Sequence, residues 1–163
     1  MKSILISIRP EWVAKIANGE KKIEIRRSKP KRELPIDVLI YCTKGKPLTR
    51  LGTLWNGDRK TDVFSLSYPP NATYNGKVVG KFRLNEIAEY QIQDAKTWSD
   101  SSFEETTKTL MGLSLNELQS YADGKPFFGW IISDLEIFDE PKSLEEFGLK
   151  RAPQSWRYVE VEE

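Results

Sequence analysis

The stretch GEKKIEIRRS, residues 19–28, alternates apolar and charged side chains, and this alternation predicts a β-strand. Read with a period of two, Ile23 and Ile25 share one face, and the charged residues around Glu24 share the other, as in a half-buried strand. An acid between two cations there has two interpretations. It is either the wet face of an edge strand, where the acid relieves repulsion between its neighbours, or part of a cleft that binds a polar ligand.

The segments on either side of this stretch predict an α+β fold. A helix with an apolar stripe is expected from Pro10 to Gly19. Two further helices with capping boxes at Ser102 and Ser114 are expected to end at Gly112 and Gly124, and a short capped turn covers 143–148. Strands are predicted at 3–8, 37–42 (central), 75–84 extended by 86–92, 127–139 with a bend near 133–134, and 155–161. Because the order shows no regular strand–helix–strand repeat, we expect a small, mixed or largely antiparallel β-barrel with helices inserted between strands.

The chain of 163 residues, 39% of them hydrophobic, is long enough for one domain with a real core, and we expect a single domain over residues 1–163. Residues 43–76 contain many Gly, Pro and Asn breakers and are predicted as a loop-rich insertion. An exposed insertion with Trp55, Phe64 and Tyr68 would favour binding of a protein partner.

Composition excludes several kinds of chemistry. The sequence has no histidine, which removes the usual general base. Because it also has only one cysteine, Cys42, we do not expect a zinc site. We therefore expect neither a metal nor a cofactor. Without a membrane-length apolar run or a visible secretion signal, we expect a cytoplasmic protein that does not enter a membrane.

Charge is unevenly distributed although the net charge is only +1. Residues 1–60 hold 15 Lys and Arg against 6 Asp and Glu, whereas residues 61–163 hold 10 against 18. Seven of the cations fall between Lys21 and Arg32. This asymmetry fits a face that meets an anion, but it also fits a basic half that is neutralised by the acidic half after folding.

Several motifs together are similar to one known family. They are SIRPEW (7–12), NGEKKIEIR (18–26), VLIYCTKGK (38–46), GKVVGKF (76–82), GWIISDLEIFDEP (129–141) and PQSWRYV (153–159). In this order they resemble the ASCH domain family of the PUA-like superfamily, in particular its compact single-domain phage and prophage members. The family signature of Gly, Lys, Glu and Arg corresponds to Gly19, Lys21, Glu24 and Arg26.

The resemblance implies a PUA-like pseudo-barrel with a cleft beside the first strand, the first helix and the signature strand, which would bind RNA or a nucleotide. Some relatives are enzymes: one group hydrolyses the acetyl amide of N4-acetylcytidine, and a ribonuclease activity is ascribed to another. The acetylcytidine amidohydrolases carry a nucleophilic threonine at the position of Glu24. A carboxylate cannot replace a hydroxyl nucleophile without a different mechanism.

The candidate ligand-binding residues come from four segments that this arrangement brings together. They are Ser7, Arg9, Lys21, Lys22, Glu24, Arg26, Tyr41, Lys44, Gln154, Ser155 and Trp156. If the protein is an enzyme, Lys21 and Glu24 are the expected acid–base pair, because desolvation in a cleft lowers the pKa of a lysine. Trp12 and Trp130 are assigned to packing.

Three functions follow from these residues. The first is a binding module that recognises a base or modified nucleoside in RNA, or a free nucleotide, in a basic cleft. The second is a hydrolase of a modified nucleoside or of RNA that uses Lys21 and Glu24. The third is a phage protein that binds a host protein.

Overall fold

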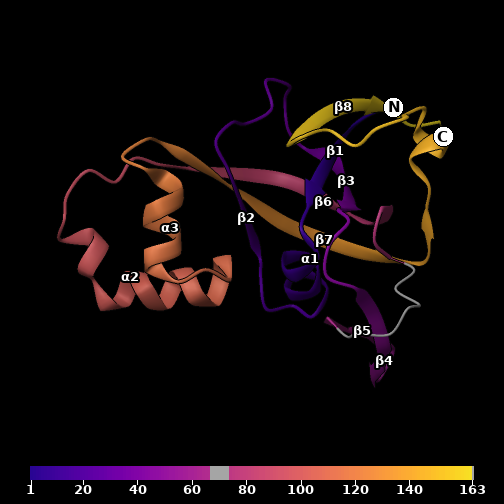
Figure 1. Ribbon diagram of the computed structural model, residues 1–163, viewed down its shortest axis with the longest axis horizontal. Helices are drawn as coiled ribbons and strands as arrows, with labels where there is room; N and C mark the ends of the chain where they lie inside the picture. Colours follow the sequence, from indigo (N-terminus) through magenta and orange to yellow (C-terminus); the bar gives the residue numbers. More distant parts are fainter. Residues whose placement is uncertain (67–73, 163) are drawn as a thin grey trace.

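The computed structural model describes residues 1–66 and 74–162, and a six-stranded mixed sheet forms its body (Figure 1). The strands are β1 (Lys2–Ile8), β2 (Ile23–Arg26), β3 (Ile36–Cys42), β4 (Leu48–Asn56), β5 (Arg59–Leu66), β6 (Lys77–Tyr90), β7 (Phe127–Lys142) and β8 (Trp156–Glu160). The helices are α1 (Pro10–Ala17), α2 (Ser101–Thr106) and α3 (Leu115–Ala122), with 3-10 turns at Thr97–Ser99 and Leu144–Phe147 and a π turn at Thr107–Met111.

The sheet has the strand order β2-β7-β6-β3-β1-β8. Strands β1 and β3 are parallel, and the other neighbours are antiparallel. The α+β class, the mixed sheet and the internal position of β3 are therefore confirmed. The closed barrel is not confirmed, because β2 and β8 are not paired with each other in the described part of the chain and remain the two edges of the sheet.

Strand β1 is buried on both faces, as expected for an internal strand. Ile4, Ile6 and Ile8 belong to the main core that α1 covers, whereas Leu5 packs in a second cluster with Val159 on the opposite face of the sheet. Burial of apolar area at about 25 cal/mol per Å² makes these two clusters the main source of stability. Apolar packing thus covers both faces of β1, and the strand contributes to the cleft through Ser7 near its C-terminal end.

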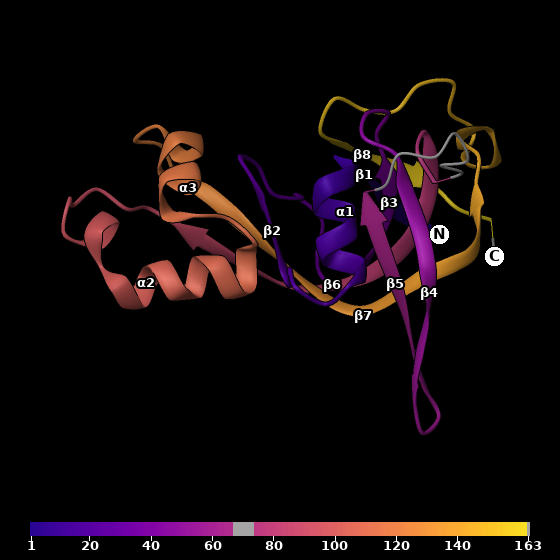
Figure 2. The same ribbon diagram turned by 60° about the horizontal axis from the view of Figure 1, so that its bottom comes forward.

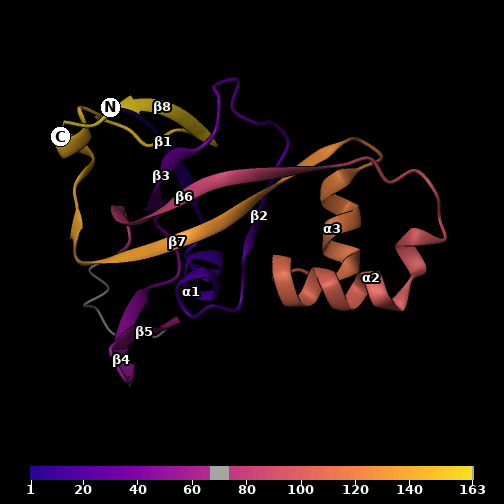
Figure 3. The same cartoon turned by 180° about the vertical axis from the view of Figure 1, so that it is seen from behind.

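Strands β6 and β7 run beyond the body of the sheet and carry a helical lobe made of α2, the π turn and α3 (Figures 1 and 3). A separate apolar cluster joins this lobe to β2 through Ile23, Ile25, Met111, Leu118 and Phe127. The apolar face of β2 is therefore buried against the helical lobe. This packing explains the alternation of residues 19–28.

Helix ends follow the sequence only in part. Ser114 forms the expected capping box with Glu117 at the start of α3. The expected box at Ser102 is wrong, because Asp100 is the N-cap of α2 and accepts a hydrogen bond from the backbone N–H of Phe103. The bend in β7 is confirmed, since Asp134 has a φ of 49° and interrupts the register with β6.

The insertion at 43–76 differs from the predicted loop. Strands β4 and β5 form a long antiparallel hairpin that projects from the body (Figure 2). The breaker residues Gly57 and Asp58 form its two-residue turn, with Gly57 at a φ of +62°, and such a pair between two strands is a hairpin signal. Trp55 is 68% exposed, but Phe64 is buried, which contradicts its expected exposure. Tyr68 lies outside the described residues.

In the part of the chain that the structure describes, no helix has the length and apolar character needed to cross a bilayer.

Candidate functional site

A cleft of about 480 Å³ opens between the end of β1, α1, β2, α3 and the segment before β8. Polar and aromatic side chains form most of its wall. The lining residues are Ser7, Arg9, Trp12, Lys21, Glu24, Ile25, Arg26, Thr43, Leu113, Glu117, Tyr121, Gln154 and Ser155. Its size and its mixed lining are those of a small-ligand site.

The turn after α1 places Lys21 inside the cleft. Gly19 adopts a φ of +77° at the end of the helix, where a side chain would be strained. The backbone N–H of Lys21 then donates to the carbonyl of Lys15, before β2 begins at Ile23. Lys21 is only 3% exposed. If the alternation of β2 extended back to Lys21, its side chain would point into the apolar core with Ile23 and Ile25. Because the strand begins later, Lys21 lies in the polar cleft instead.

Glu24 is also buried, with 6% of its surface exposed. Its neighbours Ile23 and Ile25 are buried too, so β2 is covered on both faces, by the helical lobe on one side and by the cleft residues on the other. The interpretation of Glu24 as the wet face of an edge strand is therefore wrong. A buried carboxylate requires charged or hydrogen-bonding partners.

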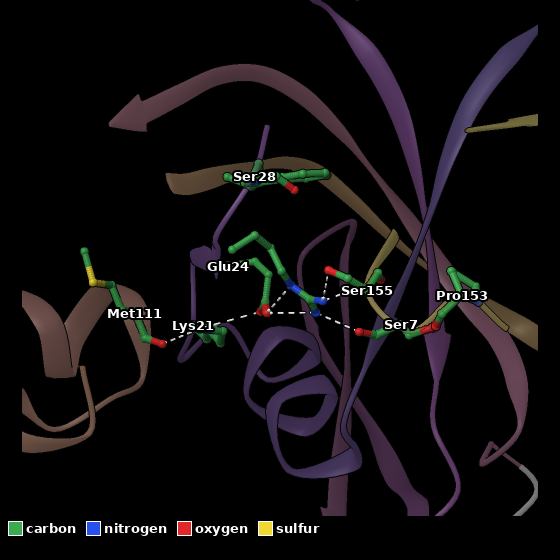
Figure 4. A network of polar contacts seen from close by, with 9 residues as sticks. Ser7, Lys21, Glu24, Ser28, Met111, Pro153 and Ser155 are labelled. Carbon is green, nitrogen blue, oxygen red and sulfur yellow. Dashed lines mark hydrogen bonds and ion pairs between the residues drawn. The ribbon is translucent and has the colours of Figure 1, made fainter. Parts of the chain in front are cut away.

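Those partners are two cations of the signature (Figure 4). Lys21 Nζ lies 3.7 Å from Glu24 Oε2, and it also donates to the backbone carbonyl of Met111. Arg26 Nε donates to Glu24 Oε1 at 3.2 Å. Glu24 Oε2 accepts no hydrogen bond from the described residues. A residue that lines the cleft thus holds one buried carboxylate oxygen whose acceptor capacity is unused.

Arg26 joins β2 to the far edge of the sheet. Its Nη2 donates to the backbone carbonyl of Ser7 at 2.7 Å, and its Nη1 donates to Ser155 Oγ at 3.1 Å. Ser7 Oγ in turn donates to the carbonyl of Pro153 at 2.7 Å (Figure 4). One guanidinium therefore fixes Glu24 and both cleft walls at once, which its planar set of donors permits.

Electrostatics in the cleft favour a lysine that loses its proton more easily than usual. Burial lowers the pKa of Lys21 from its ordinary value of 10.5, and the carboxylate of Glu24 opposes this shift only in part. Burial also raises the pKa of Tyr121. Tyr121 therefore remains a neutral phenol near pH 7, whereas Lys21 is closer to neutrality than a surface lysine.

The structure brings together most of the predicted site residues and separates four of them. Ser7, Arg9, Lys21, Glu24, Arg26, Gln154 and Ser155 all line the cleft. The other four predicted residues do not line it: Lys22 is exposed, Tyr41 packs on the opposite face of the sheet, Lys44 lies against Gly76, and Trp156 packs against the main core.

Sequence reasoning missed the wall that α3 and its preceding loop provide, namely Leu113, Glu117 and Tyr121. Their distance along the chain from the signature left no local signal, although the capping box at Ser114 did locate the helix. Trp12, assigned to packing, lines the cleft as well, with Lys21 Nζ 5.6 Å from the centre of its ring. The site therefore has aromatic surfaces that the sequence did not place there.

The cleft contains two carboxylates, Glu24 and Glu117. Over residues 1–66 and 74–162 there is no group of three or more His, Cys, Asp or Glu side chains arranged to hold a metal ion. The chemistry of the site is accordingly described by its lysine, arginines, hydroxyls and carboxylates.

Comparisons with known proteins agree on the fold. The crystal structure of ASCH from Zymomonas mobilis is 18% identical, with a TM-score of 0.63 over 97% of this chain and 87% of that chain. Two point mutants of that protein are 19% identical with TM-scores of 0.62, covering 98% and 97% of this chain and 91% and 88% of theirs. At these identities the likeness shows the fold alone. No curated protein matches.

The family model described as "ASCH domain" matches residues 6–146, which is most of the chain and includes the signature from Gly19 to Arg26. The chain therefore belongs to the ASCH domain family.

Proposed function

We propose that the cleft binds one base or nucleoside, presented by RNA or as a free nucleotide, and that Glu24 recognises its hydrogen-bond donors. The observation that carries the proposal is Glu24 Oε2, a buried oxygen of a residue that lines the cleft, which accepts no hydrogen bond from the described residues. An acceptor held there would be satisfied by an amine or imino N–H on the edge of a base. The ASCH family is generally linked to RNA binding, which agrees with this ligand class.

The rest of the cleft suits the remaining parts of a nucleotide. Trp12 and Tyr121 offer aromatic surface for stacking on a base. Arg9 lines the cleft and has no carboxylate partner in the described part of the chain, so it is available to a phosphate. Gln154 and Ser155 provide amide and hydroxyl groups for the sugar or the base.

The test compares the wild-type protein with Glu24→Gln in titrations against fluorescent single-stranded and structured RNA pools and against the four mononucleotides. Glutamine keeps one acceptor but adds an N–H₂ donor, so we expect the preferred base to change and its affinity to fall by about 1–3 kcal/mol. Glu86→Gln, an exposed change in β6, is the control. Unchanged affinities in Glu24→Gln for every pool and nucleotide would overturn the proposal.

A second candidate function, hydrolysis, is favoured by the lowered pKa of Lys21 and by its pairing with Glu24. A lysine that loses its proton more easily than usual can accept and return a proton beside a carboxylate, as a general base and acid require. The threonine nucleophile of the acetylcytidine amidohydrolases is absent, so water would attack an amide, and water or the neighbouring ribose 2′-hydroxyl would attack an RNA phosphodiester.

Two assays separate binding from turnover: the RNA endpoints of these titrations are run on a denaturing gel, and the protein is incubated separately with N4-acetylcytidine to measure acetate release. Product formation that disappears in Lys21→Met and Glu24→Gln while ligand is still bound would establish the enzyme. Absence of both binding and turnover would favour a protein partner. The exposed Leu51, Leu54 and Trp55 of the β4–β5 hairpin are the surface available to such a partner.

A further inference from the structure

The segment from Arg27 to Arg32, here called the basic rim, follows the signature strand directly. It carries Arg27, Lys29, Lys31 and Arg32, and all four are exposed. No carboxylate of the described residues forms an ion pair with any of them. Neutralisation by the acidic half of the chain therefore does not apply to the rim.

The cations of the rim are held in position by aromatic rings. The cation-to-centroid distances are 4.7 Å for Arg27 over Tyr121, 5.7 Å for Lys29 over Phe128, and 5.7 Å for Arg32 over Tyr158. Contacts of this kind restrict long side chains while their charged ends remain open to solvent. Cations that are already ordered lose less conformational entropy when they bind an anion.

The backbone of the rim is fixed as well. Tyr158 Oη accepts hydrogen bonds from the backbone N–H groups of Lys31 at 3.0 Å and Arg32 at 3.3 Å. Ser28 accepts from the indole N–H of Trp130 through its carbonyl at 3.1 Å and from that of Trp156 through its Oγ at 3.0 Å. Hydrogen bonds thus hold the backbone of the rim in place, and its cations keep fixed positions along the segment.

The rim is continuous with the cleft. It begins one residue after Arg26, which lines the cleft, and Arg27 bonds to the backbone carbonyl of Tyr121, another lining residue. Trp156, which holds Ser28, directly follows the lining residue Ser155. A ligand that leaves the cleft along β2 therefore meets the four cations next.

We propose that the basic rim binds the phosphates of a nucleic acid chain whose base occupies the cleft, so that the ligand is a polynucleotide and not a free nucleotide. This inference rests on the proposed function of the cleft. A free nucleotide has phosphate at one position only, whereas successive phosphates of a chain can meet a row of cations. The affinity contributed by such contacts is independent of sequence and falls steeply with salt.

The experiment measures affinity against ligand length. A mononucleotide and single-stranded RNAs of 3, 6 and 12 residues are titrated at several salt concentrations against three proteins. These are the wild type, the rim variant Lys29→Gln/Lys31→Gln/Arg32→Gln, and the control variant Lys81→Gln/Lys96→Gln/Lys142→Gln, which has the same net charge. Arg27 is left unchanged because it also bonds to α3.

We expect the rim variant to bind the 12-residue RNA at least about tenfold more weakly than the wild type, and its log–log salt slope to be shallower by about 2, at about 0.7 per lost phosphate contact. Binding of the mononucleotide should be the same in all three proteins. The control variant should resemble the wild type at every length.

Two failures can be told apart. RNA binding that depends on Glu24 but has the same length and salt dependence in the rim and control variants overturns the inference and leaves the proposed function intact. RNA binding that is lost in the rim variant but unchanged by Glu24→Gln overturns the proposed function and the link between rim and cleft. Absence of binding at every length overturns both.

Discussion

At the scale of single residues, Lys21 and Glu24 show how the ASCH signature makes a site. Two ionisable side chains are buried together, which is tolerable only because each is the partner of the other and both have further contacts. Arg26 uses one oxygen of Glu24, and the other oxygen faces Lys21 without a hydrogen bond from the described residues. The site therefore contains unused acceptor capacity next to a cation with a lowered pKa.

Replacing Glu24 by Gln should lower the pKa of Lys21 still further. Burial lowers that pKa, and the negative charge of Glu24 is the main effect that opposes burial. Titration of the Lys21 Nζ signal by heteronuclear NMR in the wild type and in Glu24→Gln measures the change. Glu20→Gln, an exposed acid near Lys21 in sequence, should leave the pKa where it is. A pKa that rises in Glu24→Gln would contradict the electrostatic account.

The same shift has a consequence for stability. Between the pKa of Lys21 in the folded protein and its ordinary value of 10.5, the unfolded chain binds more protons than the folded one. The contribution of Lys21 to the free energy of unfolding therefore rises with pH through this window and is lowest below it. In Glu24→Gln the window should begin at a lower pH.

Arg26→Lys should reduce the free energy of unfolding by about 1–3 kcal/mol, because an ammonium cannot reach Glu24, Ser7 and Ser155 at once. Urea unfolding followed by fluorescence measures the loss. Arg83→Lys is the matched control, since among the described residues the Arg83 side chain pairs only with Asp37, in a partly exposed ion pair, and the change should cost less than about 1 kcal/mol. Equal losses in the two variants would show that Arg26 does not bridge the cleft walls in solution.

At the scale of elements, the β4–β5 hairpin depends on α1. The side-chain amide of Asn18 donates to the carbonyl of Phe64 at 3.0 Å, and its Oδ1 accepts from the Phe64 N–H at 2.8 Å. Phe64 itself packs edge-on against Tyr74 in the main core. A two-stranded hairpin is marginal alone in water, so this attachment is what keeps the base of the hairpin ordered.

Two substitutions on the hairpin should behave oppositely. Phe64→Ala should lower the free energy of unfolding by about 3–5 kcal/mol, because it leaves a cavity in the main core. Trp55→Ala, at a side chain that is 68% exposed, should change it by no more than about 0.5 kcal/mol. Thermal and urea unfolding check both values. A large loss for Trp55→Ala would mean that the tip of the hairpin packs against something in solution.

At the scale of the whole molecule, the site exists because the sheet stays open. Strands β2 and β8 are its unpaired edges in the described part of the chain. Side chains join them where a ladder would otherwise run: Arg26 bonds to Ser155, and Trp156 bonds to Ser28. A closed ladder would leave no room for the cleft. The ASCH domain thus uses the gap between its edge strands as its candidate binding surface.

The thiol of Cys42 should report opening of the whole sheet. Cys42 is completely buried in the main core, and burial raises the pKa of its thiol to about 12. At pH 8 the thiolate fraction is then about three orders of magnitude below that of a free cysteine with a pKa near 8.5. Labelling by a disulfide reagent should therefore be slow in buffer and fast in urea above the unfolding midpoint. Rapid labelling of the native protein would contradict this packing.

Local sequence patterns were enough to predict most strands and the first helix of this protein. Hydrophobic periodicity and turn residues are local, and they predicted β1, α1, β2, β3 and the bend in β7. The signature pattern led to Lys21, Glu24 and Arg26, and the terminal segment led to Gln154 and Ser155. The hairpin was missed because breaker residues were interpreted as loop, although the pair Gly57-Asp58 carried the signal of its turn.

Which of these residues share a site depends on long-range packing. The alternation of residues 19–28 predicts that Glu24 faces solvent, whereas its burial depends on how α1 and the cleft walls pack around it, which local pattern does not reveal. Tyr121 and Glu117 enter the cleft because β6 and β7 carry a helical lobe back to β2 from about 95 positions along the chain. Long-range packing, and the failure of β2 to pair with β8, set the geometry that local preferences cannot specify.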